Sequence, residues 1–381
     1  MHISDIKTPC YVCEETLLEK NLELLDYVQK QSGAKIILAL KGFAMWSTFD
    51  LVSKYLKGCT ASGLHEARLA NGEFKKHNQD AEIHTYSPAF SKEDIQEIAK
   101  ISDHIVFNTP SQLLQYAQLS KEINPNISIS LRINPEVSSS PKDIYNPCAI
   151  YSRLGTTLAN FDENALEHIE GLNFHALCEQ NVDALEEVLI SFEKNFSKYF
   201  KNLKYINFGG GHHITKKDYD VEKLIKIIQD FREKYNVEVY LEPGEAVGWE
   251  TGYLVSTVLD VFHNGMNVCV LDTSAEAHMP DTLAMPYRAD VRDSGEAGEK
   301  KYTYRLGGNT CLAGDIMGDY SFDEPLEIGD KIIFEDQIHY TFVKNTTFNG
   351  IKLPSLAIAR KNGKIELIKE FGYEDYKERL S

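Results

Sequence analysis

The sequence lacks any long hydrophobic run. None of its stretches approaches the roughly 18 consecutive apolar residues that mark a membrane-spanning helix. Its first residues, MHISDIKTPC, also lack the cationic stretch followed by an apolar one that marks a secretory leader. We therefore expect a cytoplasmic protein. The 381 residues, 43% hydrophobic and 25% charged, suffice for two globular domains, or for one large barrel with an appendage.

The cysteines also lack a pairing pattern, and acidic residues outnumber basic ones. The seven cysteines are scattered and odd in number, which argues against a secreted disulfide framework. Cys10 and Cys13 form a lone C-x-x-C without the second pair that a zinc site requires, so no metal is expected. The net charge of −17 makes nucleic acid an unsuitable partner, because phosphate binding needs a basic face. An acidic protein does attract cationic small molecules, which is only a general indication.

What the sequence does contain is a regular alternation. Between residue 34 and residue 243, short β-branched segments alternate with longer amphipathic ones, which is typical of βα units around a parallel sheet. The candidate strands are Ile36–Leu40, Tyr55–Thr60, Glu82–Tyr86, His104–Phe107, Ile127–Ile133, Leu172–Leu177, Tyr205–Phe208 and Val237–Leu241. Eight parallel strands close a (β/α)8 barrel of the TIM type. We expect this barrel in residues 1–250, with residues 1–13 as candidates to join a second domain.

Local signals complete the predicted plan. Leu17–Val28 repeats apolar residues at helical spacing, and Ser91 and Thr109 are candidate helix N-caps. Residues 134–160 form a long Ser- and Pro-rich connection that is expected at the catalytic end of the barrel. Beyond the barrel, residues 251–381 are rich in Val, Thr, Tyr and Gly without long helical segments, and predict a mostly β domain.

Chemistry in such barrels sits where the strands end, so the residues after each strand are informative. Lys41 directly follows the apolar run IILAL. A lysine that is desolvated there has a lowered pKa and becomes a neutral amine able to attack an aldehyde. On position alone, a strand-end lysine that reaches solvent is the commoner explanation.

Three more strand ends carry suggestive groups. Gly209–Gly211 offer backbone N–H groups to a phosphate, Glu242 is placed to hydrogen-bond a pyridine nitrogen, and His175 is placed to stack on a ring. Each has a plain alternative, respectively a turn, a solvated carboxylate and a buried core histidine. Together with Lys41 they predict a pyridoxal 5'-phosphate (PLP) cofactor, which Lys41 holds as a Schiff base.

Segments along nearly the whole chain resemble the fold-type III PLP-dependent decarboxylases, which include ornithine, diaminopimelate and carboxynorspermidine decarboxylases. The shared segments are LALKGF around Lys41, TASGLHEARLA around Ser62, LRINP around Arg132, NFHAL around His175, NFGGGHH around Gly209, LEPGE around Glu242, NTCLAGD around Cys311 and HYTFVKNTTFNG around Tyr340. Within this family, LALKGF, EPGEAVGWETG and AEAHMPDTLAMPYR are most similar to the carboxynorspermidine/carboxyspermidine decarboxylases.

The resemblance implies a homodimer with two active sites at its interface, and a reaction that turns carboxyspermidine or carboxynorspermidine into spermidine or norspermidine and CO2. It implies the following cofactor-binding residues: Lys41, Ser62, Arg132, His175, Gly209, Gly210, Gly211, Glu242 and Tyr340. It also implies that Lys41, His175 and Glu242 are catalytic, together with Cys311. The Cys311 thiol would come from the neighbouring subunit and act as the proton donor.

Two departures from the ornithine and diaminopimelate enzymes bear on the substrate. Glu245 stands where those enzymes usually have arginine after E-P-G, so their phosphate contacts do not transfer simply. Leu312 stands where they have an acid after the cysteine, which implies a longer or differently anchored substrate. Glu245 and Asp281 are candidates to hold a polyamine ammonium, and Asp315 is a third candidate substrate-binding residue.

Three other functions stay open on the sequence. The first is decarboxylation of an amino acid of the diaminopimelate type. The second is a racemase on a related barrel, although a racemase needs two opposed bases and has no segment like NTCLAGD. The third is a non-catalytic PLP-binding or regulatory homologue, but such proteins tend to be shorter or to have lost the lysine or the cysteine, and this chain keeps both.

Overall fold

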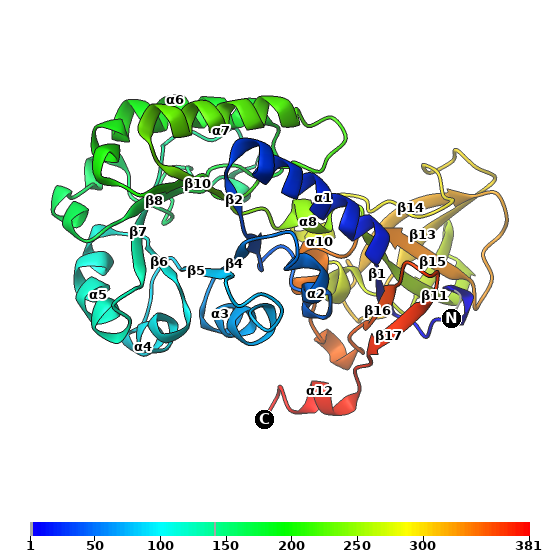
Figure 1. The fold of residues 1–381 in the computed structure, drawn as a ribbon. Helices are drawn as coiled ribbons and strands as arrows, with labels where there is room; N and C mark the ends of the chain where they lie inside the picture. The colour runs from blue at the N-terminus through cyan, green and yellow to red at the C-terminus, as the bar shows by residue number, and fades with distance from the viewer. Residues whose placement is uncertain (1–2, 141) are drawn as a thin grey trace. The chain divides into compact units, whose positions relative to one another are not determined.

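The computed structural model describes residues 3–140 and 142–381, which form two compact units (Figure 1). Residues 20–247 make the first, which we call the barrel unit. Residues 3–19 and 248–381 make the second, which we call the sheet unit.

The strands of the barrel unit are all parallel. In chain order they are β2 (Lys35–Ile36), β3 (Leu38–Ala39), β4 (Gly58–Ala61), β5 (Glu82–Tyr86), β6 (His104–Phe107), β7 (Ser128–Ile133), β8 (Gly171–Phe174), β9 (Tyr205–Asn207) and β10 (Glu238–Leu241). β2 pairs with β10, and β3 pairs with β4. Because β2 and β3 are two halves of one extended segment interrupted at Ile37, the ring closes, and the predicted (β/α)8 fold is confirmed.

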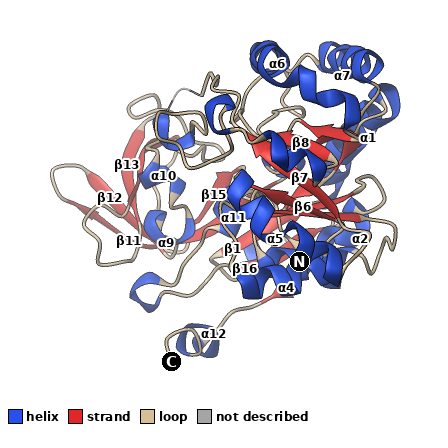
Figure 2. Ribbon diagram, turned by 90° about the vertical axis from the view of Figure 1, so that its left-hand side faces the viewer, coloured by secondary structure: helices blue, strands red, loops and turns tan. Residues whose placement is uncertain are grey.

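Helices lie outside the ring of strands (Figure 2). They are α1 (Glu15–Ser32), which begins in the sheet unit, α2 (Phe49–Val52), α3 (Leu64–Leu69), α4 (Lys92–Ile101), α5 (Pro110–Ile123), α6 (Val182–Phe196), α7 (Val221–Tyr235) and α8 (Glu245–Gly248). The predicted N-caps are confirmed, since Ser91 accepts a hydrogen bond from Asp94 N–H (3.0 Å) and Thr109 from Gln112 N–H (3.3 Å).

Most predicted strands agree with the observed bounds to within one residue at each end, but two differ by three residues at one end. The first was expected to begin at Tyr55, but Leu56 N–H bonds to Val52 O, so this apolar pair completes the turn after α2, and β4 starts at Gly58. The other, β8, ends at Phe174, which places His175 just beyond the strand rather than on it. Apolar residues next to a strand continue its sequence pattern whether or not the backbone goes on pairing, so the pattern alone does not reveal these limits.

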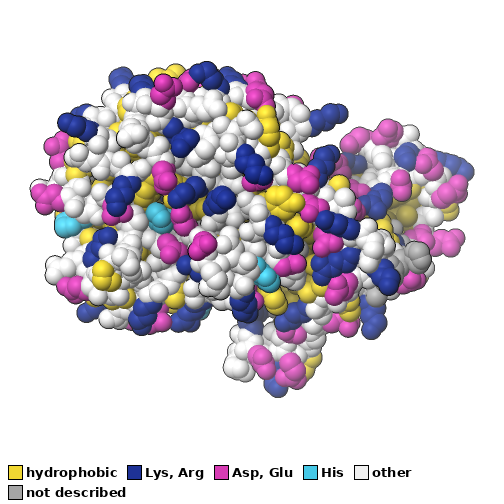
Figure 3. Space-filling model, viewed as in Figure 1, with side chains coloured by type: hydrophobic (Ala, Val, Ile, Leu, Met, Phe, Trp, Pro, Cys, Tyr) yellow, Lys and Arg dark blue, Asp and Glu magenta, His cyan; other side chains and the backbone are white. Residues whose placement is uncertain are grey.

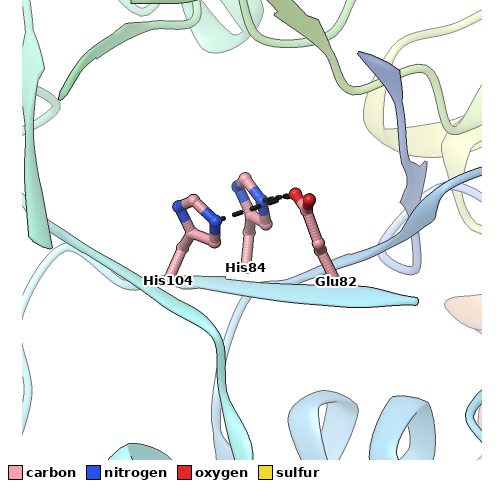
Figure 4. A group of neighbouring side chains, drawn as sticks. All are labelled: Glu82, His84 and His104. Atoms are coloured by element: carbon pink, nitrogen blue, oxygen red, sulfur yellow. Dashed lines mark hydrogen bonds and ion pairs between the residues drawn. The ribbon is translucent and has the colours of Figure 1, made fainter. Parts of the chain in front are cut away.

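The amino-terminal end of the barrel interior holds a buried polar cluster (Figure 4). Glu82 accepts hydrogen bonds from Lys35 Nζ (2.7 Å) and from the Tyr240 hydroxyl (2.7 Å). His84 and His104 stack with their ring centres 3.8 Å apart and their planes 16° apart, and each places Nε2 near the same Glu82 oxygen, at 3.4 and 3.7 Å. Nearly parallel rings do not aim their nitrogen lone pairs at one point, so the cluster is organised as a hydrogen-bond network rather than as converging metal ligands.

The sheet unit is built on one mostly antiparallel sheet. Its strands are β1 (Cys10–Glu14), β11 (Gly252–His263), β12 (Asn267–Leu271), β13 (Tyr302–Gly307), β14 (Ile316–Phe322), β15 (Lys331–Glu335), β16 (Ser355–Ala359) and β17 (Ile365–Lys369). β1, from the start of the chain, lies between β11 and β16, while β15 pairs with β11. Three short helices lie between strands, namely α9 (Ala275–His278), α10 (Asp281–Ala284) and α11 (Tyr340–Val343), and a fourth, α12 (Tyr373–Lys377), follows β17.

Cys10 and Cys13 are both buried on β1, and burial raises the pKa of each thiol to about 12. Residues three apart on a strand point to opposite faces, so this C-x-x-C pair does not converge. No helix in the part of the chain that the structure describes is long and apolar enough to cross a membrane. On the face shown in Figure 3, acidic and basic side chains are intermingled.

Candidate active site

Most of the predicted site residues lie at the carboxyl ends of the barrel strands. Lys41 follows β3, Arg132 is the penultimate residue of β7, His175 follows β8, Gly209–Gly211 follow β9, and Glu242 follows β10. Parallel strands bring their carboxyl ends to one rim of the barrel, which we call the barrel mouth.

Lys41 and His175 are in direct contact. The Nζ atom of Lys41 lies 3.3 Å from His175 Nε2, and the N–H of Gly210 donates to His175 Nδ1 (3.0 Å). A neutral imidazole whose Nδ1 accepts a hydrogen bond carries its proton on Nε2. Nε2–H must then donate to Lys41, which has a lone pair for this bond only as the uncharged amine.

The surroundings of Lys41 favour that neutral form. Lys41 is accessible to solvent, but many barrel atoms surround its amine. Desolvation by these atoms lowers the pKa of Lys41 below its usual value, and the positive charge of Arg132 lowers it further. Desolvation also holds the pKa of His175 well below its ordinary value, and the charge of Arg132 lowers it further. The geometry and the electrostatics therefore both favour the uncharged amine of Lys41, which is the form that can attack an aldehyde.

Glu242 is buried, with 7% of its surface exposed, and its Oε1 accepts a hydrogen bond from the Asn207 amide (2.8 Å). The other side of that amide, Asn207 Oδ1, accepts from the Gly209 N–H (2.8 Å). Asn207 thus fixes the carboxylate to the glycine turn. We did not predict Asn207 from the sequence, although it stands directly before the F-G-G-G stretch.

The three glycines are required by close packing. A Cβ added at Gly209, Gly210 or Gly211 would lie 2.2, 2.4 or 2.1 Å from the carbonyl oxygen of Phe174, Glu242 or Leu177, respectively. The glycine turn has fewer than three N–H groups available to bind a phosphate, however. The N–H groups of Gly209 and Gly210 are already bonded to Asn207 and His175, whereas that of Gly211 has no backbone or side-chain acceptor among residues 3–140 and 142–381.

Two further predicted cofactor residues belong to the barrel unit. Arg132 is 5% exposed and donates from a terminal nitrogen to the His175 carbonyl oxygen (3.1 Å). Ser62 is exposed just after β4, and its N–H donates to Glu66 Oε2 (2.6 Å). Glu245 lies next to the Lys41 turn, since a Cβ added at Gly42 would be 2.8 Å from its backbone nitrogen.

The remaining predicted site residues belong to the sheet unit. Cys311 is exposed, and its N–H donates to Asn349 Oδ1 (2.6 Å). Asp315, 3% exposed, accepts hydrogen bonds from the Thr310 hydroxyl (2.6 Å) and from Ala275 N–H (2.7 Å). Both carboxylate oxygens of Asp315 accept hydrogen bonds from the protein. Asp315 therefore holds the Cys311 segment against α9.

Asp281 is ion-paired rather than open to solvent. Lys344 Nζ lies 2.7 and 2.9 Å from its two carboxylate oxygens and 5.2 Å from the centre of the Tyr340 ring. Any substrate ammonium at Asp281 must therefore compete with, or displace, the ammonium of Lys344.

Glu276 was not predicted, and its environment is unusual. Its Oε2 is buried without a hydrogen-bond partner among the described residues. Desolvation, followed by the nearby charge of Asp315, raises the pKa of the Glu276 carboxyl. A buried carboxylate oxygen without a donor is costly unless a ligand supplies one. The only sequence signal was its place in AEAHMPDTLAMPYR, a segment that carried the resemblance.

The residues at the barrel mouth fit PLP. An uncharged lysine amine suits covalent attachment of an aldehyde, a buried carboxylate suits a protonated pyridine nitrogen, and Arg132 supplies positive charge. These groups come from separate strands and are linked through His175, Asn207 and the glycine turn.

Comparison with known proteins agrees with this fit. The family described as "Pyridoxal-dependent decarboxylase, C-terminal sheet domain" matches residues 10–337. The carboxynorspermidine/carboxyspermidine decarboxylase of Campylobacter jejuni is 52% identical over 99% of both chains. The carboxyaminopropylagmatine decarboxylase of Synechocystis is 43% identical over 99% of this chain and 96% of its own.

A solved structure extends the likeness to three dimensions. The crystal structure of Campylobacter jejuni carboxynorspermidine decarboxylase complexed with norspermidine superposes with a TM-score of 0.90, at 51% identity, and the alignment covers 98% of this chain and 100% of that one. The lysine, carboxylate and glycine turn at the barrel mouth, the barrel and sheet folds, and the full-length similarity lead to one conclusion: the chain belongs to the pyridoxal-dependent decarboxylases and is a PLP-dependent carboxy-lyase.

Proposed function

We propose that the substrate is a carboxylated polyamine, carboxyspermidine or carboxynorspermidine, and that the products are CO2 and spermidine or norspermidine. The observation that carries the proposal is the 52% identity, over essentially the whole length, to an enzyme named for these substrates. The same enzyme has been crystallised with norspermidine, a polyamine.

The barrel mouth supplies the cofactor contacts. Lys41 would hold PLP covalently, Glu242 would keep a proton on the ring nitrogen, and His175 is the candidate to lie against the ring. Gly211, Ser62 and Arg132 would provide further polar contacts, while Gly209 and Gly210 keep the turn close to β8 and β10.

When bound, PLP supplies an electron sink for the pair of electrons left on the α-carbon as CO2 departs. Glu242 makes that sink effective because a carboxylate stabilises the positive charge of a protonated ring nitrogen. Asn207 keeps the carboxylate in place. Cys311 then gives a proton to the α-carbon from its thiol, and the hydrogen bond from its N–H to Asn349 together with the Asp315 network sets where that thiol lies.

We also propose that the protein is a cytoplasmic homodimer in which Cys311 completes the site of the neighbouring subunit. The resemblance supports this arrangement, and the exposure of Cys311 leaves its thiol available to another chain.

Carboxylates are the natural partners of the ammonium groups along a polyamine. Glu276 is the strongest candidate because its buried oxygen has no donor among residues 3–140 and 142–381, and Glu245 and Asp281 are the others. Glu276→Gln should raise KM more than it lowers kcat, because the contact is remote from the bond that breaks. Glu324→Gln, which neutralises an exposed carboxylate of the sheet unit, is the matched control.

Lys344 allows Asp281 to be tested separately. If Asp281 binds substrate, Lys344→Met should lower KM by removing the competing ammonium, whereas Asp281→Asn should raise it. Unchanged KM in both variants would assign the pair a structural role only.

The function itself is tested by competition among carboxyspermidine, carboxynorspermidine and diaminopimelate, with released CO2 and amine products measured together. We expect either polyamine to exceed diaminopimelate in kcat/KM by several orders of magnitude, because the second carboxylate of diaminopimelate would face acidic groups. Preference for diaminopimelate would contradict the proposal. Carboxyaminopropylagmatine belongs in the same assay, because a 43% identical relative is named for it.

A further inference from the structure

Arg132 is held at the barrel mouth from two sides. Its terminal nitrogen donates to the His175 carbonyl oxygen (3.1 Å), and its guanidinium carbon lies 4.6 Å from the centre of the Tyr86 ring. The ring face attracts the cation, and the carbonyl orients one edge of it. Without the Tyr86 ring, the contact that remains to fix the Arg132 guanidinium, among the described residues, is its hydrogen bond to the His175 carbonyl oxygen.

Tyr86 is itself anchored by Asn108. Its hydroxyl donates to Asn108 Oδ1 (2.8 Å), which also accepts from Gly155 N–H (2.7 Å). Asn108 is 4% exposed, and its side-chain nitrogen donates to Arg153 O (2.8 Å).

The same residue fixes the end of the long connection after β7. The Thr156 hydroxyl donates to Asn108 O (3.0 Å), and Thr156 N–H donates to Arg132 O (2.8 Å). The returning segment is thus tied both to Asn108 and to the backbone of Arg132. None of these contacts to Tyr86 or Asn108 belongs to the roles proposed above.

We propose that Tyr86 and Asn108 are positioning residues for the lysine chemistry: Asn108 fixes the phenol of Tyr86, and the Tyr86 ring fixes the Arg132 guanidinium beside His175, where its charge controls the reactivity of Lys41. The inference rests on the proposed role of Lys41 as the cofactor lysine.

Electrostatics explains the effect. A cation next to an amine disfavours its protonation, and the influence decreases with separation. Arg132 is the largest charged contributor to the lowered pKa of Lys41, after desolvation. A guanidinium that swings away from Lys41 would leave more of the amine protonated at neutral pH, and a protonated amine cannot attack an aldehyde.

The test is the titration of Lys41 in the apoenzyme. The fraction of uncharged amine is monitored by acetylation with trace acetic anhydride at each pH, and the acetylated Lys41 peptide is quantified by mass spectrometry. Arg132→Met and Tyr86→Leu should each raise the titration midpoint by about one pH unit. Tyr86→Phe, which keeps the ring and loses only the hydroxyl, should move it less. At neutral pH the rate of covalent PLP attachment should fall by up to about tenfold in parallel, because only the neutral amine reacts.

Tyr199→Leu is the matched control. It removes an aromatic ring that lies 4.5 Å from the ammonium of Lys198, and Tyr199 follows α6 rather than the carboxyl end of a strand. The Lys41 midpoint should stay at its wild-type value in this variant. Asn108→Ala should raise the midpoint by itself and add less than its single effect in a Tyr86→Phe background, because both act through one contact.

Three outcomes would overturn the inference: an unmoved Lys41 midpoint in Tyr86→Leu while Arg132→Met shifts it, an unmoved midpoint in Arg132→Met, or an equal shift in Tyr199→Leu. Tyr86→Phe preserves packing and keeps the test decisive if Tyr86→Leu does not fold. Failure of the proposed function is recognised separately, since a covalent cofactor linkage that persists in Lys41→Ala would remove Lys41 from its role whatever the titration gives.

Discussion

The amine nitrogen of Lys41 lies 3.3 Å from Nε2 of His175. Because Gly210 N–H occupies Nδ1 of the same ring, this contact is a hydrogen bond only when Lys41 is uncharged. Desolvation, the charge of Arg132 and the tautomer of the His175 ring therefore all favour the uncharged amine of Lys41.

The first prediction concerns that amine. Lys41→Ala should lose both turnover and the visible absorption band of the purified enzyme, because Lys41 is the amine that lies beside His175 at the barrel mouth. Borohydride reduction followed by peptide mapping should find the cofactor on Lys41 in the wild type and on no peptide in the variant. Lys57→Ala, an exposed lysine just before β4, should behave as wild type. A reducible linkage that persists in Lys41→Ala would contradict the assignment.

A second prediction concerns Glu242. Glu242→Gln should retain PLP but lose about two to three orders of magnitude in kcat, because a neutral amide cannot hold the ring nitrogen protonated. Asn207→Ala, which leaves the carboxylate in place but unanchored, should lose less. The measurements are cofactor content by absorbance and single-turnover rates. Near-normal kcat in Glu242→Gln would mean that another residue sets the charge of the ring.

Much of this site was predictable because barrel topology turns strand order into spatial proximity. Lys41, Arg132, Glu242 and the glycines each follow or end an apolar run, and parallel strands bring such ends to one rim. β5 and β6 have the bounds that were predicted from their short β-branched segments. Local sequence sets these elements, which is why their bounds follow from it.

The rest depends on contacts that local sequence does not encode. Nothing next to Asn207 or Asn108 in the sequence indicates which distant group each binds. Likewise, Asp281 pairs with Lys344, which is 63 positions away in the chain. The sequence therefore did not indicate that the Asp281 carboxylate already has a partner. The glycine turn was expected to offer three N–H groups, but acceptors from Asn207 and His175 engage two of them.

The third prediction is loss of stability on acidification through the cluster at the amino-terminal end of the barrel. Desolvation, followed by the charge of His84, holds the pKa of His104 well below 6.5. Burial alone would raise the pKa of Glu82, but hydrogen bonds with His84, Lys35 and Tyr240 outweigh it and lower the pKa well below 4.5. Both groups are less protonated in the folded state than in the unfolded state.

Both groups therefore stabilise the folded state less as the pH falls. The contribution of His104 is complete above pH 6.5 and is lost as the pH falls toward the pKa of His104 in the folded state. The contribution of Glu82 is lost in the same way below pH 4.5. Each group changes the free energy of unfolding by at most about 1.4 kcal/mol per pH unit. The urea concentration at the midpoint of unfolding should decline in the wild type as the pH is lowered. Between pH 6.5 and pH 4.5 it should decline less steeply in His104→Gln. His77→Gln, at an exposed site, should follow the wild-type curve, and a steeper decline in His104→Gln would reverse the argument.

The last prediction tests whether two chains share each site. Lys41→Ala and Cys311→Ala should each be inactive alone, yet mixing them should restore activity, because a heterodimer contains one site with both residues intact. Random exchange makes half of the dimers mixed with one good site in two, which gives about a quarter of wild-type activity. Lys41→Ala mixed with the double variant is the control, since no pairing of those chains reunites the two groups. Subunit exchange is verified with differently tagged chains on native mass spectrometry. If exchange is complete and activity stays absent, Cys311 serves its own chain or no site at all, whereas recovery near one quarter requires the thiol and the lysine to come from different subunits.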